Sequence, residues 1–593
     1  MVVIAPVLWL LGYITAFYLF PVSDSLQTGF AVSAVMMAIG AVFLSRAPVI
    51  KINFLTYAIL ALWAIAAFSC ALSDVKFVSI TFLYFFSAFP ITFLLFSMMD
   101  TSIIFKCIRG ILLVLGVSAL VQFFWMPEML KFGGTHWPFS DNNSLGAMLA
   151  VGTLLFWGET LRGGKWQHAN FIATLVMFAS IMTTEGRAVA LAFAGVWIVM
   201  TMLARPVTKK PVLAFLGAVL IVLGTMTASE LSIPHWFTDG AQTIESFQTA
   251  SVDEPNHLSG SRFMIWKSTI EMFVAHPLTG TGIGTFFIYY PEYRNPLDDS
   301  AGYMAHNDLL QFAAEMGFMA PILAVLIVGF VCVQTFKRIR KIENQNDRLN
   351  LLIPFSAFVL VVGHSLVNFN FYILPSLMTT GFMLAVWNKQ IATREYVVGM
   401  KKQVRDICVV FGIFIAFIPL WGVAISEYQV GKAADELGTG NVAGFAHHLN
   451  LADTTGLGLN GRAYLQAAIF AAGTKDTKRA VGLLDRAERA NPRMAQTYVE
   501  RSKILQSTDK EAALVQARHA MLINPASLPA RVQLADMLER IGQRKEAYDV
   551  LKAGMIGRMR NPNPQSYYQR VATMALEFGD MHTNKLALER LKP

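Results

Sequence analysis

The sequence predicts an all-α fold: a polytopic transmembrane helical bundle of about 12–13 spans followed by a helical-repeat domain. Only 15% of the 593 residues are charged, whereas soluble proteins carry about 25%. The apolar residues come in runs of about 20, long enough to cross a hydrocarbon layer roughly 30 Å thick. Near residue 430 these runs stop, and alanine, leucine and charged residues replace them. We therefore expect a membrane domain over 1–430 and a repeat domain over 431–593.

Thirteen candidate spans follow one another along the membrane domain. They are roughly 3–21, 29–47, 53–72, 77–99, 104–125, 143–161, 169–184, 188–204, 211–231, 311–335, 350–368, 371–388 and 406–425. Asn368 and Asn370 lie between the eleventh and twelfth runs, so the chain either turns there or forms one broken pair. The first run lacks a basic flank and a small-residue cleavage site, which predicts a retained span. The four cysteines form no CxxC and predict neither a disulfide framework nor a thiolate metal site.

The loop charges predict an orientation. The twelve loops fall into two alternating sets of six. One set contains 19 basic residues, and the other contains six basic residues. Basic loops stay in the cytoplasm, so the N-terminus is expected there, and thirteen spans put the C-terminal domain outside. The net charge of +9 then reflects membrane topology, and we expect no nucleic-acid partner. The long loop 232–305 would face out, with an amphipathic helix from Arg262 to about Val274 at the interface.

The C-terminal domain has an internal period. Asn491-Pro492 recurs as Asn524-Pro525 after 33 residues and as Asn561-Pro562 after 37 more. Each pair follows an amphipathic, alanine-containing stretch. Helix pairs with a period near 34 and a helix-ending proline resemble tetratricopeptide repeats, which present a concave surface to a partner. The alternative is a small helical bundle that caps the membrane domain.

Four polar clusters lie toward the predicted outer face, where polar residues at membrane depth indicate function. They are Thr183-Thr184-Glu185-Gly186-Arg187, then Ser259-Gly260-Ser261-Arg262, then His306-Asn307-Asp308 with Gln311, Glu315 and Gly317, and last His364 with Asn368 and Asn370. On a helix Asp308, Gln311 and Glu315 share one face, and His306 points nearly opposite to Glu315. We therefore expect Glu315 to tie its helix to neighbours.

Two arginines and a histidine at one membrane surface indicate anion handling. Arginine holds phosphate in bidentate fashion and stays charged, and histidine can accept a proton near neutral pH. The alternatives are a headgroup anchor for Arg187, a loop salt bridge for Arg262 and a hydrogen-bonded structural role for His306. His364 and Asn368 share a helix face that could approach His306.

These segments resemble the O-antigen ligase and polymerase superfamily of membrane glycosyltransferases. The stretch from His306-Asn307 to Glu315 and Gly317 resembles its signature. The other matching blocks are Gly260–Trp266 with His276–Gly284, Glu185-Gly186-Arg187, Asp141-Asn142-Asn143 and His364–Asn370. Relatives often have aspartate where this chain has Asn368.

The resemblance implies a GT-C-like bundle in the bacterial inner membrane that takes glycan from a polyprenyl-diphosphate-linked donor. His306 would be the general base, and Arg187 and Arg262 would bind the diphosphate. Asn307, Asp308, Glu315, His364, Asn368 and Asn142 would support them. The chain has no Asp-x-Asp motif, and no metal, cofactor or nucleotide sugar is expected. Transfer would proceed with inversion.

The acceptor stays open between a glycan, a glycolipid and a protein. A ligase would use lipid A core, a polymerase another lipid-linked repeat unit, and a protein O-oligosaccharyltransferase a serine or threonine. The repeats would suit an envelope-protein partner. A lipid-linked glycan flippase or transporter is a further alternative, although the spans show no obvious internal repeat. A membrane scaffold would leave the histidine and arginines unexplained.

Overall fold

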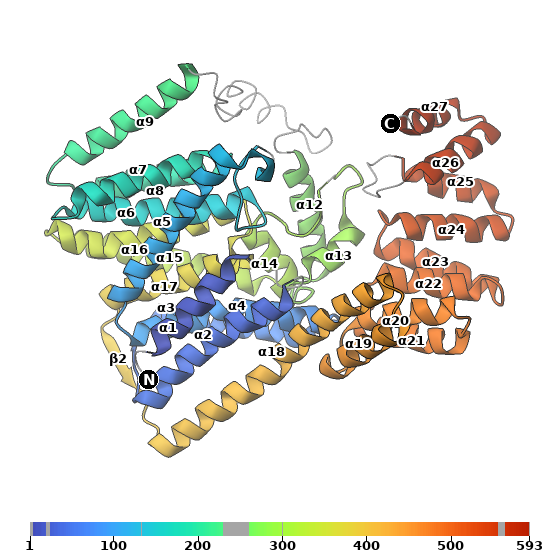
Figure 1. Ribbon diagram of the computed structural model, residues 1–593, viewed down its shortest axis with the longest axis horizontal. Coiled ribbons are helices and arrows are strands. Elements are labelled where there is room, and N and C mark those ends of the chain that lie inside the picture. The colour runs from blue at the N-terminus through green and yellow to red at the C-terminus, as the bar shows by residue number, and fades with distance from the viewer. Residues whose placement is uncertain are drawn as a thin grey trace.

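The computed structural model describes residues 4–18, 24–131, 133–228, 260–298, 300–555 and 564–591. Within these ranges the helices and strands comprise α-helices, short 3-10 helices and one two-stranded sheet. Figure 1 shows a bundle of long helices on one side and a stack of short helices on the other, with α18 (Lys402–Gly438) reaching from one to the other. The predicted fold class, a helical membrane bundle followed by helical repeats, is confirmed.

The apolar helices match the predicted spans in order. Nine helices in the described part of the chain are long and apolar enough to cross a membrane: α2 (Ser25–Ser45), α3 (Phe54–Leu72), α4 (Lys76–Met98), α5 (Ser102–Trp125), α6 (Asn142–Arg162), α8 (Arg187–Ala204), α15 (Met319–Ile339), α16 (Gln345–Ser365) and α18. The shorter or less apolar ones are α1 (Ile4–Thr15), α7 (Gln167–Met182), α9 (Lys210–Ala228) and α17 (Leu374–Ile391). The chain is therefore a multi-pass membrane protein.

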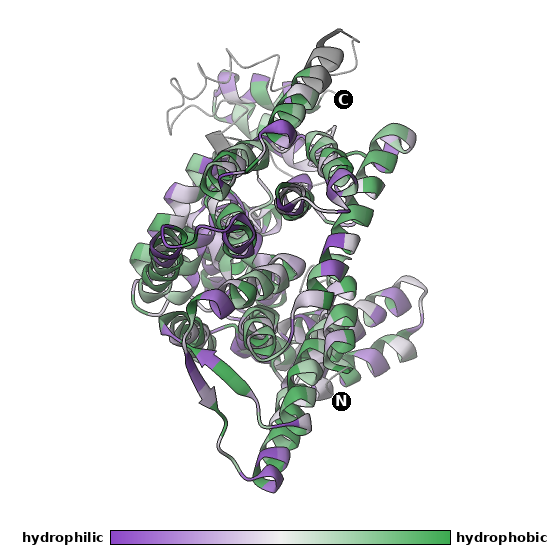
Figure 2. Cartoon of the chain, turned by 90° about the vertical axis from the view of Figure 1, so that its left-hand side faces the viewer, coloured by the Kyte–Doolittle hydropathy of each residue, from purple (hydrophilic) through white to green (hydrophobic). Residues whose placement is uncertain are grey.

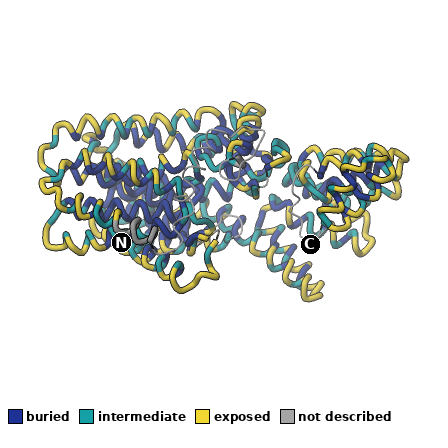
Figure 3. The backbone as a smooth tube through the Cα atoms, turned by 90° about the horizontal axis from the view of Figure 1, so that it is seen from above, coloured by how far each residue is buried: buried dark blue, intermediate teal, exposed yellow. Residues whose placement is uncertain are grey.

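The bundle buries α6 along nearly its whole length. The outer turns of α15 and α18 are exposed and apolar, as expected for surfaces that face lipid. Figure 2 shows the apolar residues along the bundle helices, and Figure 3 shows the buried interior against the exposed outer turns. Three fully buried tryptophans donate their indole N–H to threonine hydroxyls at 2.9 Å: Trp9 to Thr92, Trp157 to Thr201, and Trp387 to Thr335. These bonds satisfy indole N–H donors, for which lipid offers no acceptor.

The basic loops gather at one end of the bundle, which we call the basic end. There β1 (Val49–Ile52) pairs with β2 (Arg394–Val397) as an antiparallel ribbon that hydropathy did not predict. Arg348 of α16 donates to the carbonyl of Leu203 at 3.0 Å. Gln345 donates to the carbonyl of Leu161 at 2.7 Å. Loops far apart in the sequence, all in the basic set, therefore meet at this end.

The opposite end, which we call the site end, carries the other set of loops and the repeats. Ser25, at the start of α2, donates to the carbonyl of Ala424 in α18 at 2.9 Å. Since α2 ends at the basic end, Ala424 lies at the site end, and the repeats follow from there. The C-terminal helices thus lie at the end away from the basic loops, as thirteen spans require.

The tenth span differs from its prediction. The sequence predicts one helix over 311–335, whereas the chain forms α14 (Asp308–Met316), turns at Gly317, and starts α15 at Met319. Gly317 has φ +77° and ψ 178°, a region almost restricted to glycine, and a Cβ there would collide with the Leu278 carbonyl. Gln311 and Glu315 therefore belong to a short helix at the site end, separate from the span.

The long loop contributes two helices to the site end, α12 (Gly260–Ala275) and α13 (Phe286–Tyr293). The predicted helix is present as α12, although its buried side carries Met264, Ile265 and Met272, while Ile270 and Val274 are exposed. Ile265 and Met272 pack against α13 and against Ala305, the residue before His306. The helix thus supports the polar site. Residues 232–259 of the predicted loop, with Ser259, lie outside the described residues.

The repeats form antiparallel helix pairs. They are α19 (Val442–Thr455), α20 (Gly461–Gly473), α21 (Thr477–Ala490), α22 (Ala495–Leu505), α23 (Lys510–Ile523), α24 (Leu528–Arg540), α25 (Arg544–Ala553), α26 (Gln565–Glu577) and α27 (Met581–Leu591). The first two Asn-Pro pairs follow the ends of α21 and α23, where Asn491 and Asn524 have similar backbone angles, with φ -150° and ψ 91° against φ -142° and ψ 84°. The third pair, Asn561-Pro562, lies outside the described residues. Buried alanines recur on α21 and α23, which lets neighbouring helices pack closely.

Candidate functional site

His306 lies where the long loop enters α14. Its backbone has φ +52°, a left-handed conformation that is uncommon for residues other than glycine. Asn307 caps α14, because its side-chain oxygen accepts a hydrogen bond from the Leu310 N–H at 3.1 Å. The His306 ring meets Phe369 edge-on, with centroids 5.1 Å apart. Its Nδ1 is buried and has no hydrogen-bond partner among the described residues.

The turn after α16 lies directly beside His306. Asp308 accepts a hydrogen bond from the Phe371 N–H at 3.1 Å, which joins the start of α14 to this turn. Asn370 lies 3.2 Å from Nδ1 of His364, and Asn368 donates to Asn370 at 3.3 Å. The segment that carries His364 and Asn368 therefore lies beside His306, as predicted. The two residues do not share a helix face, however, because α16 ends at Ser365 and Asn368 lies in the following turn.

Several polar atoms in this cluster are buried without a partner in the described part of the chain. They are Nδ1 of His306, Nε2 of His364, Oδ1 of Asp308 and Oδ1 of Asn368. A buried polar atom without a hydrogen bond costs about 1–3 kcal/mol, so four together are unusual for a purely structural core. Such a cluster can bind a polar ligand that supplies the missing partners.

Arg262, on the first turns of α12, brings positive charge to the same cluster. Its charge acts on both His306 and His364, so it lies within electrostatic reach of the two rings. Burial and, next, the Arg262 charge lower the pKa of His306 to about 4, while Asp298 acts in the opposite direction. His306 is therefore a neutral imidazole at physiological pH. Within the described ranges no carboxylate pairs with Arg262, and its predicted alternative, a loop salt bridge, is absent there.

Arg187 is the first residue of α8, after a turn in which Glu185 has φ +56°. The Arg348–Leu203 hydrogen bond fixes the level of α16 against its antiparallel neighbour α8. Sixteen residues beyond Arg348 is His364, and sixteen residues before Leu203 is Arg187. Both helices rise roughly 24 Å over that length. Arg187 and His364 therefore lie at about the same height along the bundle, at its site end. None of the described residues forms a hydrogen bond or ion pair with the Arg187 side chain.

Glu315 joins three segments and is fully buried. Its carboxylate accepts hydrogen bonds from the N–H groups of Gly284 at 2.7 Å and Phe286 at 3.0 Å. The Tyr372 hydroxyl and the Gln311 amide also donate to it, at 2.5 and 3.1 Å. Three of the four contacts come from other segments, namely Gly284, Phe286 and Tyr372, which agrees with the expected tying role.

Asn142 is the first residue of α6, after a loop that bonds to Thr183 in the turn before Arg187. Its amide donates to the Lys131 carbonyl at 2.8 Å. In the same loop Thr135 bonds to Thr183 through both backbone and side chain. His136 follows, and its buried Nδ1 has no partner among the described residues. Sequence reasoning did not single out His136, because one histidine in a short loop carries no spacing signal.

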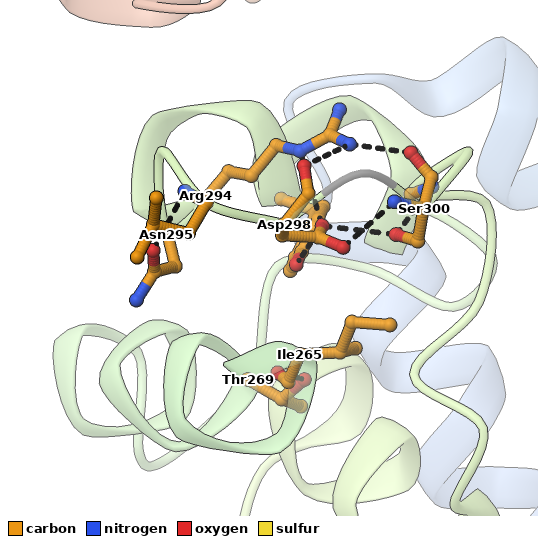
Figure 4. Close-up of polar contacts among 9 residues, drawn as sticks. Ile265, Thr269, Arg294, Asn295, Asp298 and Ser300 are labelled. Carbon is orange, nitrogen blue, oxygen red and sulfur yellow. Dashed lines mark hydrogen bonds and ion pairs between the residues drawn. The ribbon is translucent and has the colours of Figure 1, made fainter. Parts of the chain in front are cut away.

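Asp298 is a second residue that the sequence did not reveal. Its buried carboxylate accepts a hydrogen bond from Tyr290 at 2.7 Å and pairs with Arg294 at 3.0 Å. Figure 4 shows the Asp298 side chain between Arg294 and Ser300, with the α12 residues Ile265 and Thr269 below. This network braces the chain that leads to His306. Only the run Asn-Pro-Leu-Asp-Asp-Ser could have signalled a turn there.

The repeats contact the site-end loop through Arg493. Its guanidinium pairs with Glu292 of α13 at 2.6 Å and lies over the Tyr289 ring, 4.6 Å from the centroid. Tyr289 in turn donates to Asp74 at 3.1 Å. One ion pair and one ring contact therefore connect the repeats to α13, the helix whose first N–H is bound by Glu315.

The fold and this site define a multi-pass membrane protein with a partly unpaired, positively charged polar site at one end of its bundle. Residues 172–325 match the family model described as O-Antigen ligase, so the chain carries an O-antigen ligase domain there. This segment includes Arg187, Arg262, His306 and Glu315, and it supports a role in glycan transfer at a membrane. A search of curated proteins found no match.

Two solved structures are similar in part. One, a mutant of MamA, is 19% identical, covers 28% of this chain and 97% of its own, and has a TM-score of 0.21. The other, yeast Tom70, is 12% identical, covers 83% of this chain and 92% of its own, and has a TM-score of 0.25. Both TM-scores are low, and the repeat architecture rests on the helix pairs of the chain itself.

Proposed function

We propose that this protein transfers a glycan from a polyprenyl-diphosphate-linked donor to an acceptor hydroxyl. The observation that carries the proposal is the Arg262 guanidinium, without a carboxylate partner in the described part of the chain, beside unpaired nitrogens of His306 and His364. A diphosphate would supply the missing negative charge and acceptors. The O-antigen ligase domain over 172–325, which includes Arg262 and His306, supports this donor class.

Arg262 and Arg187 bind the diphosphate in this mechanism. Bidentate hydrogen bonds from guanidinium groups hold phosphate oxygens and stabilise the charge that develops on the leaving group. Arg262 comes from the loop and Arg187 from the start of α8, so the two contact the diphosphate from different elements. The leaving group departs as an anion and needs no protonation.

His306 acts as the general base. The acceptor oxygen attacks the anomeric carbon as the bond from that carbon to the phosphate oxygen breaks, and the bonding pair leaves with the diphosphate. The hydroxyl proton moves to the neutral His306 ring. The depressed pKa keeps this ring free of a proton before the reaction. Attack opposite the leaving group inverts the anomeric configuration.

In this account the site end faces the periplasm, and the basic end faces the cytoplasm of a bacterial inner membrane. The separation of basic loops from the site supports that orientation. Asp308, Asn307 and Glu315 hold α14, and His364 and Asn368 offer further groups to the donor or acceptor. The repeats, beside the site, would bind an envelope protein. We also propose the division of the chain into 1–430 and 431–593.

Glycolipid analysis of a deletion strain tests the proposal. Accumulated polyprenyl-diphosphate-linked glycan in the outer leaflet supports transfer: single repeat units indicate a polymerase, and long chains indicate a ligase. If the glycan accumulates only in the cytoplasmic leaflet, the flippase alternative holds instead. Loss of glycan from a periplasmic protein would identify the protein O-oligosaccharyltransferase version.

A further inference from the structure

A second polar cavity lies at the basic end, away from the site described above. It has a volume of about 370 Å³ and lies between the first turns of α5, the last turn of α6, and the adjacent turns of α16 and α17. Its polar lining includes Lys106, Arg109, Glu159, Arg162 and Asn350. The proposed glycan transfer uses none of these residues.

The cavity carries excess positive charge and free hydrogen-bond donors. Glu159 is its only acid among the described lining residues, against three cations. It lies 3.7 Å from Nη1 of Arg109 and 3.4 Å from Nε of Arg162. These ion pairs leave Nε and Nη1 of Arg109 and Nε of Arg162 buried without a hydrogen-bond partner in the described part of the chain. An anion would satisfy these donors.

The depth of the cavity indicates where that anion comes from. Arg109 is seven residues into the apolar helix α5, or roughly 10 Å from the helix start. Arg109 is therefore near the basic end of a membrane-spanning helix, where a long basic side chain can reach lipid headgroups. The Arg109 guanidinium lies 5.7 Å from the centroid of Phe105 and 5.6 Å from that of Phe156. The other walls include Ile353, Pro354 and Val386, so one side is polar and charged and the other apolar.

We propose that this cavity binds the phosphate headgroup of an anionic phospholipid from the leaflet at the basic end. Arg109 and Arg162 hold the phosphate oxygens, and Lys106 adds charge at the rim. The acyl chains follow the apolar wall formed by Phe105, Ile353 and Val386. The bound lipid joins α5 and α6 to α16 and α17, since the cavity is lined by all four helices.

Lipid binding to the purified full chain tests the proposal. Phosphatidylglycerol is titrated in detergent, and its retention is measured by native mass spectrometry for the wild type, Arg109→Gln, Arg162→Gln and the control Lys341→Gln. Lys341 is exposed in the loop between α15 and α16 and does not line the cavity, and its substitution changes the net charge by the same amount. Affinity is expected to fall roughly tenfold for each arginine variant, because a hydrogen bond to a charged group is worth about that factor. The control should bind as the wild type does.

Two results would overturn the proposal. One is equal lipid binding by the two arginine variants and Lys341→Gln. The other is displacement of the lipid by millimolar inorganic phosphate, which would assign the cavity to a soluble phosphate compound. If Arg109→Gln does not fold, lipid binding by Arg162→Gln alone tests the proposal. The Arg162 side chain is 29% exposed against 18% for Arg109, so its substitution disturbs the packed interior less.

Discussion

Nη1 of Arg493 lies 2.6 Å from Oε2 of Glu292, and this pair joins the repeats to the loop that carries the site. Glu292 belongs to α13, whose first residue, Phe286, donates its N–H to Glu315. Glu315 is on α14, which begins two residues after His306. The position of the repeats is thereby connected to the position of His306 through short contacts and one helix.

Reversing the Arg493 charge should loosen α13. In Arg493→Glu we expect faster hydrogen exchange over 286–293, because like charges replace the pair. The double variant Arg493→Glu, Glu292→Arg should restore slow exchange. Arg544→Glu breaks a pair with Glu577 inside the repeats and serves as the control. Unchanged exchange in Arg493→Glu would show that the pair does not hold α13.

The pH dependence of transfer should identify His306. Transfer requires the neutral ring, so the rate should stay level from neutral pH downward and fall as the pH approaches the His306 pKa of about 4. Arg262→Gln removes a positive charge that lowers this pKa, so the acid limb should move to higher pH even though the maximal rate also falls. Lys267→Gln, an exposed residue on the same helix, should leave the limb in place. An unmoved limb in Arg262→Gln would remove the electrostatic link between the two residues.

Glu315→Gln should destabilise the site end without abolishing membrane insertion. One carboxylate oxygen is replaced by an amide NH2 group, which donates hydrogen bonds and cannot accept them. At least one buried backbone N–H therefore loses its acceptor. The cost is about 1–3 kcal/mol for each such group. Thermal unfolding in detergent should show a lower Tm, and Tyr372→Phe, which removes one donor, should show a smaller decrease. Equal melting temperatures for Glu315→Gln and the wild type would contradict the tying role.

Gly317→Ala should prevent the turn between α14 and α15. The backbone there is almost glycine-only, and the added Cβ would collide with the Leu278 carbonyl. We expect a large loss of folded protein, measured by size-exclusion chromatography after detergent extraction. Gly329→Ala is the matched control, because it lies on α15 with nothing within 4 Å of the added carbon. Equal yields of the two variants would show that the turn tolerates a side chain.

Hydropathy predicted the membrane helices because each span must satisfy its own backbone in lipid. It missed the break at Gly317, since a single glycine in an apolar run is compatible with a continuous helix. It also missed the ribbon of β1 and β2, because these two short strands contain no long apolar run. They come from distant loops, and only the packed bundle brings Ile50 opposite Tyr396.

The candidate site was predictable in part. The motif resemblance singled out His306, Arg187 and Arg262. The shared helix face predicted for His364 and Asn368 was wrong, because α16 ends at Ser365 and Asn368 lies in the turn that follows. The partners of Glu315 were not predictable, because Gly284, Phe286 and Tyr372 reach it only through tertiary packing. The Arg493–Glu292 pair likewise joins residues 201 positions apart, which no local pattern encodes.

Glycan transfer by the purified full-length protein tests the role of His306 most directly. The protein is placed in vesicles that contain the polyprenyl-diphosphate-linked donor and the acceptor identified from the deletion strain. His306→Ala should lower the rate roughly 10²–10⁴-fold, the usual contribution of a general base, while the protein stays folded and still binds donor. Arg187→Ala and Arg262→Ala should weaken donor binding, and Lys267→Gln should behave as the wild type. Transfer by His306→Ala at the wild-type rate would show that His306 is not the general base.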